Sequence, residues 1–135
     1  MSALHVRVQV GDEHYALPVA DVLEVAELGD VTPVPGAGPA VLGVRNLRGQ
    51  VLPVIDLATI LELAASEPKH MVVTESGGRT AGLAVDSVAG VEQLPDASEE
   101  TGSRHLIAAT LADGALVGVV DVDSVLGAVE RASTG

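Results

Sequence analysis

The stretch VLGVRNLRGQVLPVIDLATIL, from Val41 to Leu61, decides how this chain folds. It sets an exposed turn, Asn46-Leu47-Arg48-Gly49, between two apolar runs. Arg45 and Arg48 are the only cations between Val19 and Glu67. A pair of cations on a tight loop of an acidic protein indicates a place where a partner docks, and no catalytic motif competes with that interpretation.

The composition excludes several classes of function. With 135 residues and a net charge of −12, the chain suits a single domain, and its acidity disfavours DNA, RNA and anionic membranes, whose phosphates are bound by Lys and Arg. The absence of cysteine excludes disulfides and thiolate metal sites. No apolar run approaches the roughly 20 residues that span a bilayer, and the first residues lack the pattern of a signal peptide. We therefore expect a cytoplasmic protein that neither inserts into a membrane nor binds nucleic acid.

Apolar runs bounded by turn residues predict a mainly β chain. From His5 to Val10 the valines point to one side and the polar residues to the other, which is typical of a half-buried strand. Asp21–Glu27 fits either a helical turn or a short strand, and Thr32–Pro39 is rich in Pro and Gly and fits a loop. Further strands are expected at Tyr15–Val19, Gln50–Ile55, Met71–Glu75, Arg79–Val85, Leu106–Leu111 and Leu116–Val120.

The two halves of the chain resemble each other. Five apolar residues recur 66 positions later: Leu17, Val19, Val22, Val25 and Leu28 match Leu83, Val85, Val88, Val91 and Leu94. The run Val54-Ile55-Asp56-Leu57 recurs 65 positions later as Val119-Val120-Asp121-Val122. The shared shift predicts a single domain, 1–135, made of two similar, intertwined subdomains, with a pseudo-repeat at about 5–65 and 70–131. Each subdomain is expected to be a small barrel, because barrels leave no exposed sheet edges, and a groove should lie between the two.

These motifs resemble the CheW-like adaptor family of bacterial chemotaxis over nearly the whole chain. The most specific part is VLGVRNLRGQVLPVIDL, from Val41 to Leu57. It is supported by Pro33-Val34-Pro35 before it, by GLAVDSVAGVEQLP from Gly82 to Pro95, and by LVGVVDVDSVL near the end. The resemblance implies two SH3-like five-stranded barrels side by side, with short helices including one at the C-terminus.

The same resemblance implies a function. Members of the family have no enzymatic activity and couple the cytoplasmic tips of chemoreceptors to the regulatory domain of a CheA-type histidine kinase, with a receptor helical hairpin in the groove between the barrels. Carried over by position, the receptor-binding groove is lined by Val22, Glu24, Asn46, Arg48, Val85, Asp86 and Val88. A stand-alone adaptor is favoured, at receptor arrays by association.

Each of these residues also has a purely structural interpretation. Arg48 could hold its turn by bonding carbonyls or a nearby carboxylate, and Val22, Val85 and Val88 could be plain core. Arg45 stands where the family has a neutral residue, and we interpret it as a solvated surface residue. The acidic loop Asp96–Ser103 has no clear counterpart in the family.

Catalytic, cofactor and metal sites are not expected. Asp56 and Asp121 could be mistaken for a catalytic carboxylate pair, but each can cap a helix, as can Asp123, and the last helix should run to about Arg131. The four histidines are scattered without metal-ligand spacing. Two alternatives stay open: an adaptor of the same fold in a non-motility chemosensory pathway, and a sensor that binds a small molecule between the barrels.

Overall fold

The structure is a computed structural model that describes residues 3–64, 66–95 and 104–134, so the loop Asp96–Ser103 lies outside the described residues. Its elements run in the order β1 (Ala3–Val10), β2 (Glu13–Pro18), the 3-10 helix η1 (Val19–Asp21), β3 (Val22–Glu27), β4 (Val41–Leu47), β5 (Gln50–Asp56), α1 (Leu57–Ile60), β6 (His70–Ser76), β7 (Arg79–Val85), β8 (Ser87–Leu94), β9 (Leu106–Ala112), β10 (Ala115–Val120) and α2 (Val122–Thr134). The ambiguous segment Asp21–Glu27 thus forms the end of η1 and a strand. No helix in these residues is long and apolar enough to cross a membrane.

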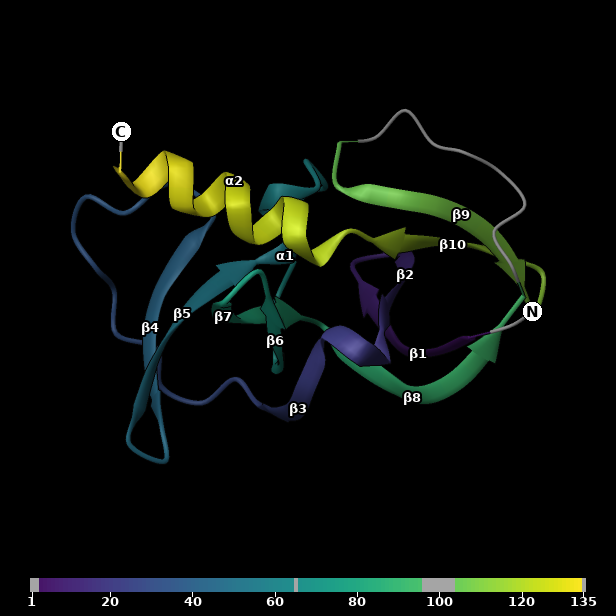
Figure 1. The fold of residues 1–135 in the computed structure, drawn as a ribbon, viewed down its shortest axis with the longest axis horizontal. Helices are drawn as coiled ribbons and strands as arrows, with labels where there is room; N and C mark the ends of the chain where they lie inside the picture. The colour runs from purple at the N-terminus through teal and green to yellow at the C-terminus, as the bar shows by residue number, and fades with distance from the viewer. Residues whose placement is uncertain (1–2, 65, 96–103, 135) are drawn as a thin grey trace.

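The strands form two five-stranded sheets that lie side by side, and α2 runs along one edge of the molecule (Figure 1). We call them sheet A, with the order β8-β1-β2-β10-β9, and sheet B, with the order β3-β6-β7-β5-β4. The predicted mainly β fold with two five-stranded units and a C-terminal helix is confirmed. Each unit is an open sheet rather than a closed barrel, because its two end strands do not pair with each other.

Each sheet takes strands from both halves of the chain. The β1–β2 hairpin of the first half joins β8, β9 and β10 of the second, whereas the β6–β7 hairpin of the second half joins β3, β4 and β5 of the first. The two sheets therefore do not coincide with the repeats at about 5–65 and 70–131, because each half contributes strands to both sheets. The sheets are completed by parallel pairing, of β10 with β2 and of β5 with β7, which brings together strands far apart in the sequence.

The two sheets match pair by pair under the shifts found in the sequence. In sheet A the parallel pair is Val119 opposite Ala16, and in sheet B it is Val54 opposite Gly82. Val119 is 65 positions after Val54, and Gly82 is 66 positions after Ala16. The β-bulges also recur at equivalent places, between Arg7 and Val8 in the β1–β8 pair and between Val22 and Glu24 in the β3–β6 pair. The repeat in the sequence is therefore a pseudo-twofold relation between two complete sheets.

The core lies mainly between the sheets and is built from aliphatic side chains. The equivalent residues Leu17 and Leu83 are both fully buried there, with Val6, Val8 and Val10 from β1. A second cluster, around Leu52 and Met71, lies on the other face of sheet B. Burial of each large aliphatic side chain stabilises the fold by about 1.5–3 kcal/mol, which compensates for the shortage of aromatic residues.

The two helices begin at the expected aspartates but are capped differently. At α2, the carboxylate Oδ1 of Asp121 accepts a hydrogen bond from the backbone N–H of Ser124 at 3.2 Å. At α1, Asp56 makes no such bond with the backbone, and its Oδ2 instead accepts one from the hydroxyl of Thr59 at 2.8 Å. The predicted side-chain cap is thus found at Asp121 and not at Asp56, whose carboxylate bonds the Thr59 hydroxyl instead.

Candidate functional site

The turn between β4 and β5 presents Arg48 to solvent. Leu47 and Gln50 form the last pair of the hairpin, and Arg48 and Gly49 between them have φ of 51° and 87°. A two-residue turn with φ above zero at both positions is type I′, which suits the twist of an antiparallel pair. The side-chain Oδ1 of Asn46 accepts a hydrogen bond from the N–H of Gly49 at 2.8 Å. Asn46 and Gly49 therefore build the turn, and the guanidinium of Arg48 is left to act elsewhere.

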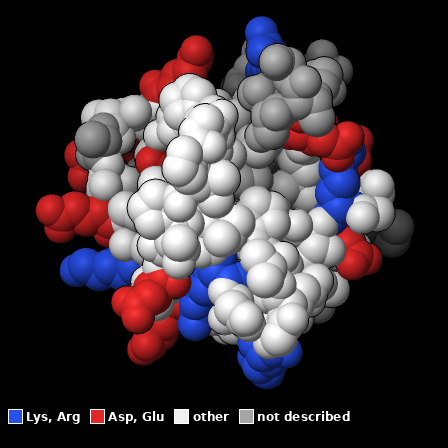
Figure 2. Space-filling model, turned by 90° about the vertical axis from the view of Figure 1, so that its left-hand side faces the viewer, with Lys and Arg blue, Asp and Glu red and all other residues white. Residues whose placement is uncertain are grey.

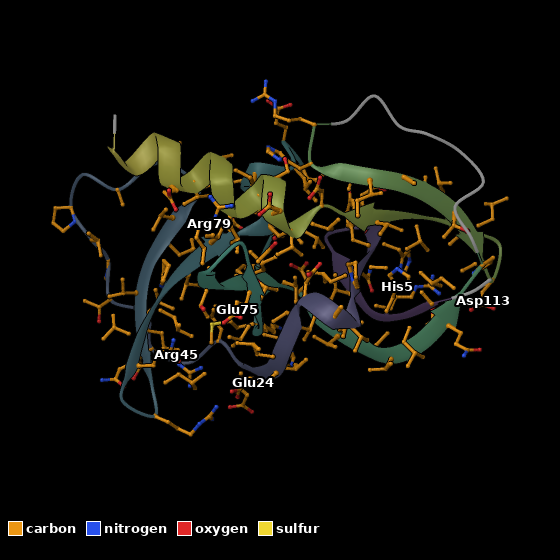
Figure 3. All side chains as sticks on the ribbon, in the orientation of Figure 1. His5, Glu24, Arg45, Glu75, Arg79 and Asp113 are labelled. Carbon is orange, nitrogen blue, oxygen red and sulfur yellow. The ribbon has the colours of Figure 1, made fainter. Side chains whose placement is uncertain are left out.

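Arg48 makes an ion pair with Glu24 on β3. The pair joins the two end strands of sheet B, β3 and the β4–β5 hairpin, so it closes the open side of that sheet. The side chain of Arg48 is nevertheless 68% exposed and that of Glu24 is 33% exposed. An exposed ion pair contributes at most about 1 kcal/mol, so a partner's carboxylate can replace Glu24 at little cost. Figure 3 shows Glu24 on the lower side of the molecule, pointing outward.

The three valines assigned to the groove differ in how far they are buried. Val22 and Val88 are half-buried at the inner ends of β3 and β8 and pack against the core between the sheets. In Figure 1, β3, η1 and β8 follow one another along the lower edge of the molecule, where the two sheets meet. Val85, in contrast, has none of its surface exposed. Its assignment to the groove is corrected, because a side chain inside the core cannot contact a partner.

Asp86 makes hydrogen bonds that join the β7–β8 corner to the β1–β2 turn. Its Oδ2 accepts a hydrogen bond from the N–H of Gly11 at 2.9 Å, and its own N–H donates to the carbonyl oxygen of Gln9 at 3.0 Å. These bonds hold the corner between β7 and β8 against the β1–β2 turn. Asp86 therefore has a structural role whether or not a partner also touches it.

Two apolar residues to which the sequence analysis assigned no role in binding lie on the same strand as Glu24. Leu23 and Val25 on β3 are 57% and 43% exposed, on either side of Glu24. Isolated exposed apolar residues are common, but two on one end strand of a sheet form a patch that a partner can contact, on the opposite face of β3 from Glu24 in the case of Val25. The open choice between a helical turn and a strand for Asp21–Glu27 hid them, because the two periods assign different side chains to the solvent-facing side.

Arg45 is a structural residue rather than a solvated one. Its Nη1 donates a hydrogen bond to the carbonyl oxygen of Glu27 at 2.8 Å, and its guanidinium lies against Gly29. Arg45 thereby holds the chain leaving β3 against β4. Of the two cations on this hairpin, only Arg48 remains accessible to a partner.

A second candidate surface lies at the far end of sheet B. A hollow of about 530 Å³ opens there between α2, β4, β5, β7 and the loop before β4. Its lining is mostly apolar, with Val34, Pro35, Val44, Pro53 and Val129 as examples. Figure 2 views this end and shows a broad uncharged surface with the charged side chains gathered around it. On an acidic protein, an uncharged concave face of this kind favours contact with another apolar surface.

One cation borders the hollow. Arg79 on β7 makes ion pairs with Asp123 at 2.9 Å and Glu130 at 3.6 Å, and so fastens α2 to sheet B. The residues that the structure describes contain no group of three or more His, Asp or Glu arranged to hold a metal ion. Within the described residues, the arrangement offers two candidate binding surfaces.

Comparison with known proteins gives a consistent result. Residues 5–130 match the model of the CheW-like domain family. The chain is 31% identical over 134 residues to the chemotaxis protein CheW of Rhizobium meliloti (strain 1021), covering 91% of this chain and 86% of that protein. It is 32% identical to the protein FrzA of Myxococcus xanthus, covering 78% and 72%. The crystal structure of the scaffolding protein TtCheW from Thermoanaerobacter tengcongensis matches with a TM-score of 0.78 at 25% identity over 89% of both chains. With its two intertwined five-stranded sheets, its Asn-Leu-Arg-Gly turn and this match over nearly its full length, the chain belongs to the CheW-like domain family of chemotaxis-type adaptors.

Proposed function

We propose that this protein is a non-enzymatic adaptor that couples the cytoplasmic tips of chemoreceptors to the regulatory domain of a CheA-type histidine kinase. The observation that carries the proposal is the accessible Glu24–Arg48 ion pair at the open side of sheet B, in which the side chain of Arg48 is 68% exposed. Membership of the CheW-like family supplies the class of partner. The proposal needs two separate surfaces, one for the receptor and one for the kinase.

The receptor surface is proposed at the junction of the sheets. Val22 and Val88 form its apolar floor, and Glu24, Asn46 and Arg48 border it. A helical hairpin rich in Glu and Gln would offer carboxylate and amide oxygens to the planar guanidinium of Arg48, which can donate two parallel hydrogen bonds. Asp86 fixes the shape of the border through Gly11 and Gln9.

The kinase surface is proposed at the uncharged end of sheet B. The hollow bordered by Val44, Pro53 and Val129 would receive apolar side chains of the kinase regulatory domain. Sheet A would hold a neighbouring kinase domain, so that alternating copies could close a ring. A signal would then pass as small shifts in the packing of receptor, adaptor and kinase, which requires different contacts in the two signalling states.

A charge reversal at Arg48 tests the division between the two surfaces. Arg48→Glu should weaken binding of a purified receptor cytoplasmic tip by about tenfold or more, because it removes the donor and faces the receptor's carboxylates with a like charge. Affinity for the kinase regulatory domain and the melting temperature should stay nearly unchanged. Isothermal titration calorimetry with each partner and a thermal melt supply the three measurements.

Arg104→Glu is the matched control, because Arg104 is also exposed and the change in net charge is the same. It should leave both affinities near those of the natural protein. Equal loss of receptor and kinase binding in Arg48→Glu, with an unchanged melting temperature, would contradict the proposed roles. Failure of the natural protein to bind any kinase regulatory domain from the same source would contradict the function itself.

A further inference from the structure

Arg7 on β1 is a buried cation at a position where the other sheet carries an apolar residue. Only 10% of its side chain is exposed. Under the shift of 66 positions, its equivalent in sheet B is Val73, which is 3% exposed and lies in the cluster around Leu52 and Met71. The pseudo-twofold relation therefore brings out a difference between the sheets, because sheet A holds a charged side chain where sheet B holds an apolar one.

Arg7 points away from the core that lies between the two sheets. Side chains alternate along a strand, so Arg7 faces the opposite side of β1 from Val6 and Val8, which belong to that core. Across the sheet, the residues in line with Arg7 are short and buried, in the order Ala16 on β2, Val119 on β10 and Ala108 on β9. Short side chains in this line leave room for the long stem of Arg7, and its guanidinium reaches the end strands of the sheet.

The guanidinium of Arg7 lies between carboxylates from the two sides of sheet A. Its Nη1 donates a hydrogen bond to Oε1 of Glu92 on β8 at 2.8 Å. The same nitrogen lies 3.5 Å from Oδ2 of Asp113, at the tip of the β9–β10 hairpin. Strands β8 and β9 are the two ends of sheet A, and Figure 1 shows the end of β8 and the β9–β10 turn at the same end of the molecule. Arg7 therefore links two strands that do not pair with each other.

The two contacts of Arg7 are unequal. The distance to Glu92 is that of an ordinary hydrogen bond, whereas the distance to Asp113 is too long for one, so Asp113 interacts through charge alone. A small rotation of the guanidinium would bring it to Asp113, whose side chain is 88% exposed and free to move. An arginine stays charged throughout, so exchange between the two carboxylates needs no change of protonation.

Stability alone does not explain why a cation is buried here. Burying an ion pair costs desolvation that the attraction often fails to recover, and apolar residues of similar size commonly replace such a pair without loss of stability. Sheet B shows the apolar alternative, because the equivalents of Arg7 and Glu92 are Val73 and Ala26, which both pack in one apolar cluster. The ion pair in sheet A therefore points to a role other than stability.

Strand β8 connects this ion pair to the proposed receptor surface. Val88, on the floor of that surface, pairs with β1 on one side of a β-bulge, and Gly90 lies opposite Arg7 on the other side. Ala89, between them, has no place in the β1–β8 register, so the ladder is interrupted directly beside Arg7. Glu92 follows two residues after Gly90 on the same face, so a shift of β8 at the bulge moves Glu92 relative to the guanidinium.

We propose that Arg7 is a positioning residue that couples β8 to the β9–β10 hairpin by exchanging its hydrogen bond between Glu92 and Asp113. While β8 keeps Glu92 in place, Arg7 bonds Glu92, and charge alone holds the hairpin tip. When β8 shifts, Arg7 bonds Asp113 and fixes the tip against β1. Leu111 and Leu116, opposite each other beside the tip, then change their surroundings. Only the cause of the shift of β8, contact with a receptor, rests on the proposed function.

Relaxation of the backbone amides, measured by NMR on the full chain without a partner, tests the exchange itself. Glu92→Gln keeps the size of the side chain and removes its charge, so the guanidinium of Arg7 should pass to Asp113. The order parameter of the Gly114 amide should then rise toward the value of about 0.85 that is typical of rigid backbone. Glu67→Gln, which neutralises an exposed glutamate outside the strands, is the control and should leave Gly114 unchanged. Unchanged or lower order at Gly114 in Glu92→Gln would overturn the exchange.

Two further variants separate the exchange from a merely structural role of Arg7. Arg7→Met keeps a long unbranched stem and should fold with a melting temperature near that of the natural protein. The order of Gly114 should fall in it, and the addition of Glu92→Gln should no longer raise it. Asp113→Asn should likewise abolish the rise, and this variant decides the question if Arg7→Met does not fold. A rise at Gly114 that persists in either background would overturn the role of Arg7.

A purified receptor cytoplasmic tip tests what moves β8. Its binding to the methyl-labelled chain should shift the signals of Val88 at the receptor surface and of Leu111 and Leu116 at the hairpin. In Arg7→Met the Val88 signal should still shift, whereas the shifts at the hairpin should be lost. Arg104→Met, which removes the same charge at an exposed position, should keep both sets.

The outcomes distinguish the coupling from the proposed function. If the receptor tip binds and the hairpin signals shift equally in Arg7→Met and Arg104→Met, the receptor does not act through Arg7 and the proposal is overturned. If no receptor tip binds the natural protein while Gly114 responds to Glu92→Gln as expected, the proposed function fails and the exchange at Arg7 stands.

Discussion

Arg48 and Asp113 show how one backbone position can serve opposite chemistry. Both occupy the first place of a type I′ turn, with the same φ of 51°, followed by a glycine. The turn requires the glycine and a residue that tolerates positive φ, and it leaves the charge of the first side chain free. Selection for a partner can therefore act on the charge without disturbing the hairpin.

Gly43 is the glycine whose replacement should cost most. Its φ is 150°, and an added Cβ would lie 2.1 Å from the carbonyl oxygen of Thr32. Thr32 and Val44 exchange two backbone hydrogen bonds of 2.8 Å each, which cover the outer edge of β4. Gly43→Ala should force these segments apart and lower the free energy of unfolding by about 3 kcal/mol or more, as measured by urea denaturation.

Gly36→Ala is the control for Gly43→Ala. Gly36 also has positive φ, 82°, but an added Cβ would meet nothing within 4 Å. Only the backbone strain should remain, about 1–2 kcal/mol. Equal losses in the two variants would mean that the close approach to Thr32 adds nothing to stability.

Tyr15 should make stability fall at alkaline pH. Burial, and then the charge of Glu13, raises the pKa of the Tyr15 hydroxyl above its usual value near 10. The folded state therefore favours the protonated form, so the contribution is fully present below about pH 10 and is lost as the pH rises through the raised pKa. Because Tyr15 is the only tyrosine, its ionisation can be followed directly by ultraviolet absorbance.

Two variants check the causes of this shift. Tyr15→Phe should remove the corresponding part of the alkaline loss in the free energy of unfolding. Glu13→Gln should lower the absorbance midpoint of Tyr15, because it removes the neighbouring negative charge. An unchanged midpoint in Glu13→Gln would show that burial alone raises this pKa.

Among the elements, α2 depends on its first aspartate more than on its second. Asp121 satisfies the backbone N–H of Ser124, and loss of such a cap costs about 1 kcal/mol. Asp123 bonds Arg79 and Ser76, but its side chain is 62% exposed, and exposed pairs contribute about 0.2–1 kcal/mol. Asp121→Ala should therefore lower the melting temperature more than Asp123→Ala, measured by calorimetry. The reverse order would assign the anchoring of α2 to Arg79.

At the scale of the whole molecule, the exchanged hairpins make the halves interdependent. Sheet A lacks two central strands without β1 and β2, and sheet B lacks two without β6 and β7. If the chain is divided after Ser66, each fragment alone should be largely unfolded, and the mixture should recover the strand content of the intact protein. Circular dichroism of the fragments, singly and mixed, supplies the measurement. A first-half fragment that folds as a monomer would contradict the need for exchange.

The sequence alone determined the local structure and the family. Alternating valines and turn pairs such as Asp113-Gly114 depend on backbone dihedrals and side-chain period, which act within a few residues. These features predicted most strands, the α2 cap at Asp121, and the exposed turn within the Val41–Leu57 motif. They also identified Arg48 as an exposed residue.

Only the tertiary structure decided which strands share a sheet and which residues reach the surface. Pairing of β5 with β7 and of β10 with β2 joins residues far apart in the chain, and no local pattern specifies it. The same packing buries Val85, turns Arg45 toward Glu27, and brings Glu24 to Arg48. Only the pairing of the strands shows that Arg48 and Asp113 occupy equivalent positions with opposite charges. Burial and ion pairing follow from contacts between distant segments rather than from the sequence of any one segment.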